Sequence, residues 1–255
     1  MKSVYFALFL TLISATALRA ADINITADNR VEWHQKSKKM VASGNAVASK
    51  DGLTVKADTL TGFYTEKSGA AGSGISRVIA NGNVRMETPK AKAFGNNLDY
   101  DLTKDEAVLT GAPSKIDTGT EVITAEDKIT YYPKEQKAIA LGNVTATDKS
   151  KNKLYADKMV AEFAKENNKS ENMVLKKVNI FGNVKIVNEE TTVTADKGSY
   201  QPEIGVVRLF DNVVINQQGN VLHGDKAETN LKTGISKLLS TSSKNKVKGV
   251  FKEKK

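Results

Sequence analysis

A row of carboxylates recurs along the chain and is the first feature whose residue types could do chemistry. Each follows a small residue, as in Ala57-Asp58, Ala125-Glu126 and Ala195-Asp196. Carboxylates can act as general acids or bind hard cations. One position of the series is Asn96, however, and an amide cannot replace a general acid. Because Asp, Asn and Glu also accept hydrogen bonds at turns, the series favours a structural role.

Other reactive residue types are sparse. His34 and His223 lie at unrelated phases of the repeat, which favours two solvated surface side chains. The chain has no Cys, so thiolate metal sites and disulfides are excluded. No Gly-rich phosphate loop, nucleophile elbow or His-rich metal spacing occurs. Trp33 stands beside Val31 and is predicted to be a packing residue. We therefore expect no catalytic residue, no metal site and no cofactor, and interpret the chain as a protein that is not an enzyme.

The elements that position the carboxylates form a repeat along the whole chain. A second landmark, Gly-Asn followed by an apolar alternation, precedes six of the seven acidic or Asn positions by 14 or 15 residues. The Gly-Asn landmarks are Gly44-Asn45, Gly82-Asn83, Gly142-Asn143 and Gly182-Asn183, with degenerate copies at Gly111-Ala112 and Asp211-Asn212. The carboxylate series is Asp28, Asp58, Asn96, Glu126, Asp157, Asp196 and Asp225. Polar insertions at 68–74 and 166–170 explain the two longest intervals, so the unit is about 30 residues, repeated about six times.

Apolar and polar residues alternate within each unit, which predicts strands. Val178, Ile180, Val184 and Ile186 share one parity, with Gly182 in the middle of the run. Glycine inside a strand usually marks a bulge or bend. A bend in every unit predicts an all-β, twisted jelly roll or solenoid-like stack, whose two sheets enclose an apolar interior groove.

Two interpretations of that interior remain open. Its residues are often small, as at Ala42, Ala80 and Ala140, and only 6% of the chain is aromatic. Space left unfilled between the sheets could hold acyl chains, each buried CH₂ contributing about 0.8 kcal/mol. Alternatively, the small residues let the sheets approach and leave a dry core.

The N-terminal sequence and the distribution of charge indicate where the protein is located and which partners it can bind. Lys2 followed by the apolar run 4–17 and small residues predicts a signal peptide over residues 1–20, with an uncleaved anchor as the alternative. The repeat domain is expected over 22–240 and a basic, disordered tail over 241–255. The tail and the signal peptide supply nearly all of the +9 net charge. The near-neutral body argues against nucleic-acid binding.

The landmarks also carry a resemblance to a known family. The Gly-Asn starts, the small-acid landmarks and the runs 98–111 (LDYDLTKDEAVLTG) and 126–136 (EDKITYYPKEQ) resemble the OstA-like family of periplasmic lipopolysaccharide transport proteins, that of LptA. The opening 22–28 (DINITAD) is similar to that family's first strand. The resemblance covers essentially the whole mature chain, although the repeat from about Gly142 onward extends beyond a typical member.

The resemblance implies a periplasmic protein whose interior shields the acyl chains of lipid A. It also implies a bridge between inner-membrane and outer-membrane transport components that carry homologous jelly-roll domains. Positions transferred from the family are Ile23, Ile25, Met86, Tyr100 and Leu102. The inward parity adds Leu53, Val55, Val84, Leu98, Val144, Val184, Ile186, Val213 and Ile215 as candidate lipid-binding residues.

Two further expectations concern partners. Strand edges near 23–27 and 221–239 are expected to be unpaired, and such edges favour head-to-tail association with a second copy or a homologous domain. The alternative function is a periplasmic scaffold or stalk with a dry core that binds polysaccharide or protein on its outer face. A β-helix carbohydrate enzyme would need clustered catalytic carboxylates and is disfavoured, because the recurring carboxylates are assigned a structural role at turns.

Overall fold

The chain folds into strands, as the alternation predicts. A computed structural model describes residues 23–50, 52–65, 74–111, 113–166, 173–241 and 246–250, and this part contains 18 strands and no helix. The expected signal peptide lies outside these residues. The strands are β1 (Asn24–Thr26), β2 (Arg30–His34), β3 (Lys39–Lys50), β4 (Leu53–Thr65), β5 (Gly74–Glu87), β6 (Lys92–Asp101), β7 (Glu106–Thr110), β8 (Ser114–Asp117), β9 (Glu121–Ala125), β10 (Lys128–Tyr132), β11 (Lys137–Asp148), β12 (Lys153–Lys165), β13 (Met173–Val187), β14 (Thr191–Gln201), β15 (Val206–Gln217), β16 (Asn220–Asn230), β17 (Ile235–Leu239) and β18 (Lys248–Val250).

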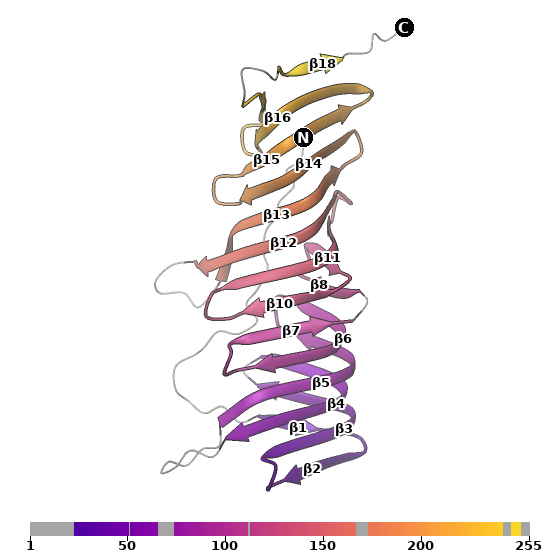
Figure 1. Ribbon diagram of the computed structural model, residues 1–255. Helices are drawn as coiled ribbons and strands as arrows, with labels where there is room; N and C mark the ends of the chain where they lie inside the picture. The colour runs from indigo at the N-terminus through magenta and orange to yellow at the C-terminus, as the bar shows by residue number, and fades with distance from the viewer. Residues whose placement is uncertain are drawn as a thin grey trace.

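All strands belong to one continuous antiparallel sheet, and each long strand pairs with the next one along the chain. They stack along one long axis, from β2 at one end to β18 at the other (Figure 1). Each strand therefore contacts mainly its sequence neighbours, which is the organisation of a solenoid.

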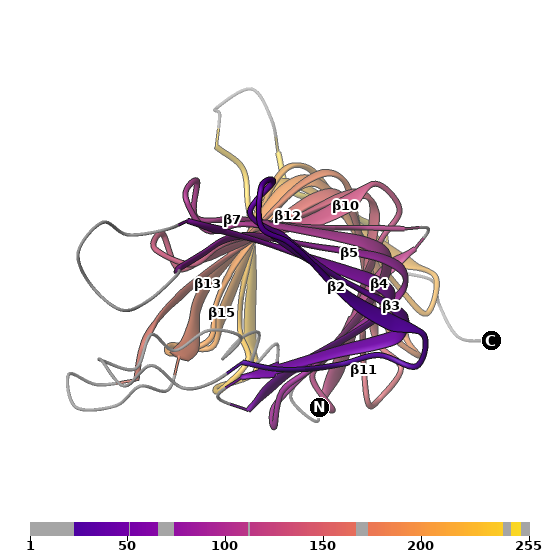
Figure 2. The ribbon, with the colours of Figure 1, turned by 90° about the horizontal axis from the view of Figure 1, so that it is seen from below.

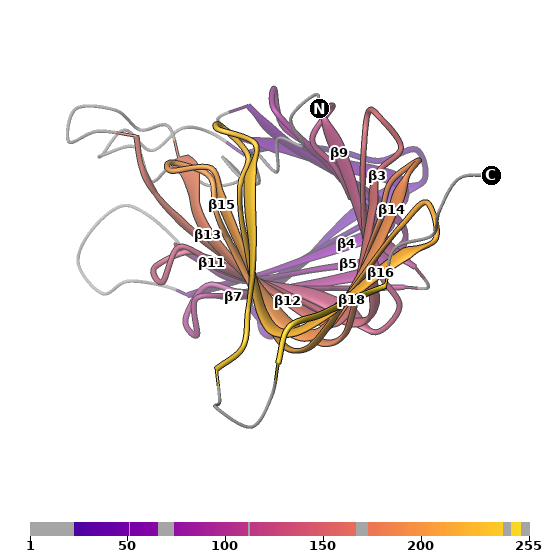
Figure 3. The same ribbon diagram turned by 90° about the horizontal axis from the view of Figure 1, so that it is seen from above.

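A bend divides every long strand at its landmark. The β3–β4 register shifts between Ser43 and Ala46, and the β5–β6 register shifts between Asn81 and Val84. The first half of β3 pairs with β2 and the second half with β1. We call the two resulting walls the β1 wall and the β2 wall, after their first strands. Seen along the axis from either end, the strands curve round the interior (Figures 2 and 3).

At five bends, the Asn of a Gly-Asn or Asp-Asn landmark donates to the carboxylate of the preceding strand. At one bend Gly82 and Asn83 have φ of 76° and 49°, and the Asn83 amide donates to both oxygens of Asp58 at 3.0 and 3.1 Å. A Cβ at Gly82 would collide with the same carboxylate. The bond recurs as Asn45 to Asp28, Asn143 to Glu126, Asn183 to Asp157 and Asn212 to Asp196. The role of these carboxylates is thus structural, with a side-chain amide on the next strand as partner.

The ends of the stack differ from the expectation for the tail. Residues 248–250, expected to be disordered, form β18, which pairs with Val221–His223 of β16. Val247 and Val250 are β-branched residues, which favour a strand, although the neighbouring lysines obscure this preference. The exposed edge at this end is therefore formed by β17 and β18, while β1 and β2 form the opposite edge.

Candidate functional site

A large cavity occupies the interior of the N-terminal half of the stack. Its volume is about 640 Å³, within the size range of small-molecule sites, and every residue that lines it falls between Ile23 and Tyr131. The β1 wall contributes Ile23, Ile25, Ala48, Ser49, Lys50, Leu53, Val55, Met86, Ala93 and Ile116. The β2 wall contributes Met40, Ala42, Leu60, Thr61, Gly62, Gly74, Ile75, Val78, Leu98, Tyr100, Leu102, Ala107, Leu109, Ile129 and Tyr131.

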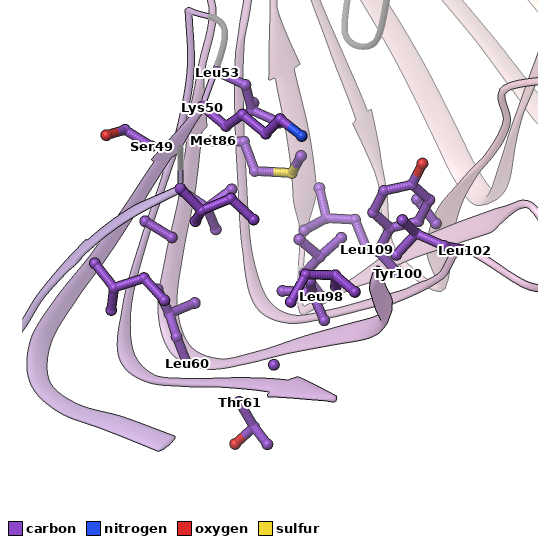
Figure 4. A pocket seen from close by; sticks show the side chains of 18 of the residues that line it. Ser49, Lys50, Leu53, Leu60, Thr61, Met86, Leu98, Tyr100, Leu102 and Leu109 are labelled. Carbon is purple, nitrogen blue, oxygen red and sulfur yellow. The ribbon is translucent and has the colours of Figure 1, made fainter. Parts of the chain in front are cut away.

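Eight of the residues expected from the sequence line this cavity. They are Ile23, Ile25, Leu53, Val55, Met86, Leu98, Tyr100 and Leu102. Figure 4 shows Leu53 and Met86 on one side and Leu98, Tyr100 and Leu102 on the other, with the hydroxyls of Ser49 and Thr61 turned away from the apolar side chains. The alternating parity brings these side chains together because facing residues of paired strands, such as Val55 and Met86, point to the same side of the sheet.

The other six expected residues lie outside the cavity lining. Val84, Val144, Val184 and Val213 come directly after a bend and are at most 2% exposed, so they fill the close-packed angle of the bend. Ile186 and Ile215 are partly buried against the core of the C-terminal half. Parity predicts only which side of the sheet a side chain faces. These residues lie outside the cavity because of their position along the stack and their distance from the bend.

Sequence reasoning missed much of the β2 wall. Met40, Leu60, Ile75, Leu109 and Ile129 all line the cavity. The same parity, extended to the strand halves that precede each bend, would have found them: Leu60 pairs with the inward Ala42, and Leu109 pairs with both Leu98 and Ile129. It would also have placed Lys50 inward, after Ala46 and Ala48.

Among the described residues that line the cavity, Lys50 is the only charged one. Two tyrosines face the interior from the opposite wall. Tyr100 and Tyr131 both pair with Ala107, which lies between them. Burial raises the pKa of Tyr131 to about 12, helped by Tyr100 and Asp105, and burial likewise raises the pKa of Tyr100. Both phenols therefore stay neutral at physiological pH.

Trp33 differs from the packing residue that the sequence suggested. It is 66% exposed, and its Nε1 donates to the Tyr64 hydroxyl at 2.6 Å, with the ring centroids 6.3 Å apart. Trp33 pairs with Met40, and Val31 pairs with Ala42. The apolar interior face therefore continues to the end of the stack, where β2 has no strand beyond it and leaves these side chains exposed.

The residues for which the sequence predicted no catalytic or metal-binding role lie at the surface or stabilise the fold. His34 and His223 are both exposed, and His34 contacts Glu32 at 3.0 Å. Within the described ranges, no cluster of three or more His, Cys, Asp or Glu side chains could hold a metal ion. Nor does this part of the chain contain a helix long and apolar enough to cross a membrane.

A second, much smaller cavity marks the passage into the C-terminal half. It measures about 40 Å³ and is lined by Ile116, Glu121, Ile123, Ile129, Ala138, Ala140, Met159, Ala161, Leu175 and Val178. The side chains around it are close-packed, and Glu121 is only 5% exposed. The interior thus narrows where the large cavity ends.

An open antiparallel β-jelly-roll stack with an apolar interior is the class of protein that this fold and cavity define. The family model of the LptA/LptD N-terminal domain lipopolysaccharide transport proteins matches the chain twice, over residues 24–137 and again over 123–235. The chain belongs to this family. We call these segments the first unit and the second unit; the strands β9 and β10 lie where they overlap.

A solved structure also matches this chain. The crystal structure of LptH, the LptA-homologous periplasmic component of the lipopolysaccharide transport device of Pseudomonas aeruginosa, is 11% identical, with 91% of this chain and 96% of that chain covered and a TM-score of 0.22. Among curated proteins, no sequence matches this chain.

The two units correspond residue by residue through their pairing. Asp28, Gly44 and Asn45 of the first unit stand where Glu126, Gly142 and Asn143 stand in the second. Further along, Gly82 corresponds to Gly182 and Tyr100 to Tyr200. The offset is 98 to 100 residues throughout. The repeat beyond Gly142 is therefore a second copy of the family unit.

Proposed function

We propose that this protein carries lipopolysaccharide in the periplasm and shields the acyl chains of lipid A in the cavity of the first unit. The observation that carries the proposal is the cavity itself: about 640 Å³ of interior space, lined from both walls by aliphatic side chains. The lipopolysaccharide transport family supports the choice of ligand. The predicted signal peptide at residues 1–20 supports the periplasmic location.

The energetics favour a ligand with long apolar chains. Each methylene transferred from water into the cavity contributes about 0.8 kcal/mol. Strongly polar ligands would lose hydration and gain few partners, since Lys50 is the only charged group that the structure describes in the lining. A soluble sugar or a nucleotide therefore fits the interior poorly, whereas acyl chains fit it well.

Photo-crosslinking tests the placement of the chains. A photo-reactive residue at Ile25, Met86 or Tyr100 should capture lipopolysaccharide in cells, because these side chains face the cavity. The neighbouring positions Asn24, Arg85 and Asp101 have the opposite parity and serve as matched controls. Capture is read as a shifted band that reacts with an antibody against lipopolysaccharide. Equal capture from both sets would contradict binding in the cavity.

We further propose that the ends of the stack dock homologous domains of the inner-membrane and outer-membrane components, or a second copy, to form a bridge. Strand β2 pairs only with β3 among the described strands, and its Val31 and Trp33 are 50% and 66% exposed. An added strand would cover these side chains and extend the groove across the junction. At the other end, β17 and β18 expose Ile235 and Val250.

A charge placed on this edge tests the docking. Val31→Lys should lower concentration-dependent association in analytical ultracentrifugation, because an inward-pointing lysine on an edge strand opposes pairing. The matched control is Glu32→Lys, whose side chain has the outward parity on the same strand. Association unaffected by Val31→Lys, or lowered equally by both variants, would contradict docking at β2.

A further inference from the structure

The one charged side chain among the described lining residues lies at the end of β3. Lys50 follows Ala46 and Ala48 in the inward parity and pairs with Leu53 across the turn to β4. Figure 4 shows it beside Leu53 and Met86, with its nitrogen directed over the apolar side chains. Lysine can cover apolar surface with its methylenes while its ammonium group stays in water, and the exposed Lys50 is placed to do so.

The ammonium group of Lys50 has no carboxylate partner among the residues that the structure describes. The carboxylate on the neighbouring strand end is already occupied: Glu87 accepts two hydrogen bonds from Arg85 and lies 3.8 Å from Lys56 and 3.6 Å from Lys92. On the opposite wall, the raised pKa values of Tyr100 and Tyr131 keep these phenols neutral. Among the described residues, the rim of the cavity therefore presents one positive charge without a carboxylate partner.

The second unit reverses this charge. Asp148 of β11 occupies the position of Lys50, at the end of the strand after the Gly-Asn bend. Its carboxylate accepts hydrogen bonds from the Asn152 backbone and side chain at 2.9 and 2.7 Å, and it pairs in register with Glu121 of β9. Two acidic residues thus stand where the first unit has Lys50 beside Ile23.

We infer that Lys50 recognises a phosphate on the head of the bound amphiphile, so that the first unit selects acyl chains attached to an anionic sugar head. This inference rests on the proposed function, because the acyl chains in the cavity place the head at the rim. An ammonium–phosphate contact is a charge-assisted hydrogen bond, which is stronger than a neutral one. The acidic pair of the second unit repels the same phosphate, and the head group is therefore held at one position along the stack.

Binding measurements with two lipids test the inference. The full chain is titrated with phosphorylated lipid A and with dephosphorylated lipid A of the same acyl composition, using displacement of a fluorescent fatty-acid probe. The wild-type protein should bind the phosphorylated lipid about tenfold more tightly, the ratio expected for one hydrogen bond between charged groups. Lys50→Gln should lose this preference and bind both lipids like the dephosphorylated one, and Lys50→Arg should keep it.

A matched control and a competitor complete the design. Lys185→Gln removes the same charge from an exposed, outward position of the second unit and should leave the ratio unchanged. A preference that survives in Lys50→Gln overturns the inference while the proposed function stands. Inorganic phosphate that displaces the probe or abolishes the preference as effectively as the lipid would assign Lys50 to free phosphate and also overturn it. Failure of the wild-type protein to bind either lipid would refute the proposed function itself.

Discussion

The two units share their bends but differ in how the strand ends beyond the bends are packed. In the first unit Tyr64 pairs with Ile75, both are half-buried, and the Tyr64 hydroxyl accepts the Trp33 hydrogen bond at the end of the stack. In the second unit the corresponding pair is Phe163 and Leu175, which are only 5% and 9% exposed. The Phe163 ring is thus buried in the interior, whereas the Tyr64 ring, whose hydroxyl holds a polar partner, stays half-buried.

The comparison teaches that the family fold is compatible with both a hollow and a filled interior. Bends fix the two walls, and the side chains farther from the bends decide whether space remains between them. Near the bend the units even exchange large and small residues: Ala80 pairs with Leu98, and Ile180 pairs with Gly198. Such paired exchanges nearly conserve the side-chain volume at these positions. The close-packed core of the second unit and the cavity of the first are therefore built on the same repeat.

Removal of the buried Phe163 ring should leave a cavity in the second unit like that of the first. Phe163→Ala is expected to lower the free energy of unfolding by about 4 kcal/mol, because it leaves a cavity in a close-packed region. Urea denaturation measures this loss. Tyr64→Ala, the matched variant, should cost less than half as much since Tyr64 is half-buried. Equal losses would mean that the two interiors are filled alike.

Substitution of the bend glycines, in contrast, should lower the free energy of unfolding equally in both units. Gly82 and Gly182 have φ of 76° and 74°, and a Cβ at either position would collide with the carboxylate of Asp58 or Asp157. Gly82→Ala and Gly182→Ala should each lower the free energy of unfolding by about 3 kcal/mol, measured by urea denaturation. Gly119→Ala is the control, since its φ is also 76° but nothing lies within 4 Å. A large difference between the two variants would show that the bends are not equivalent.

Lipid binding should depend on the first unit alone. Met86→Asp introduces an unpaired charge into the cavity lining and should weaken lipopolysaccharide binding about a hundredfold, equivalent to about 2.7 kcal/mol. Ile186→Asp makes the same change at the corresponding position of the second unit and should leave affinity nearly unchanged. Probe displacement measures both affinities. Comparable losses would place lipid in both units.

The smallest expected difference concerns alkaline pH. The folded-state pKa of Tyr131 is about 12, above the ordinary value of about 10, so the folded chain holds this proton more tightly than the unfolded chain. Stability that the neutral phenol provides below pH 10 is therefore lost as the pH rises toward 12. Tyr131→Phe should reduce the loss by on the order of 1 kcal/mol, as the ring is only partly buried. The second unit has Thr229 at the corresponding position and thus no phenol to titrate there, so Thr229→Ser should leave the pH profile unchanged. Urea denaturation between pH 8 and pH 11 measures both profiles, and a Tyr131→Phe profile identical to that of the wild type would contradict the assignment.

Much of this architecture can be predicted from the sequence because the repeat is local. The Gly-Asn and small-acid landmarks mark the bends, and the parity around them identified residues such as Leu53 and Val55 as inward-facing. Bend geometry depends on residues that lie within one strand pair. A local pattern of about 15 residues is enough to specify it, and the sequence contains that pattern repeatedly.

The extent of the cavity could not be predicted in the same way. Val84 and Met86 share one parity after the same bend, but Val84 lies next to the bend and Met86 lies two residues further on. Val84, like Val184 in the second unit, is buried in the angle of the bend. Side-chain size changes in both directions between the units, since Met40 corresponds to Ala138 while Ala107 corresponds to Val207. Whether space remains depends on the separation of the walls, which is a property of the whole stack. The strand at 248–250 escaped prediction because its lysines dominate the local composition.

The duplication also conserves strand polarity. Two strands that are separated only by a bend, such as β1 and β2, count here as one. The first unit then consists of six strands: β1/β2, β3, β4, β5, β6 and β7/β8. The pattern begins again at β9/β10. This number is even, and neighbouring strands are antiparallel, so adding a unit restores the direction of the chain. Growth by whole units therefore lengthens the molecule by about 29 Å, at about 4.8 Å per strand, without inverting the edge at its end. A partner built for the end of one unit meets the same edge polarity on a chain of two.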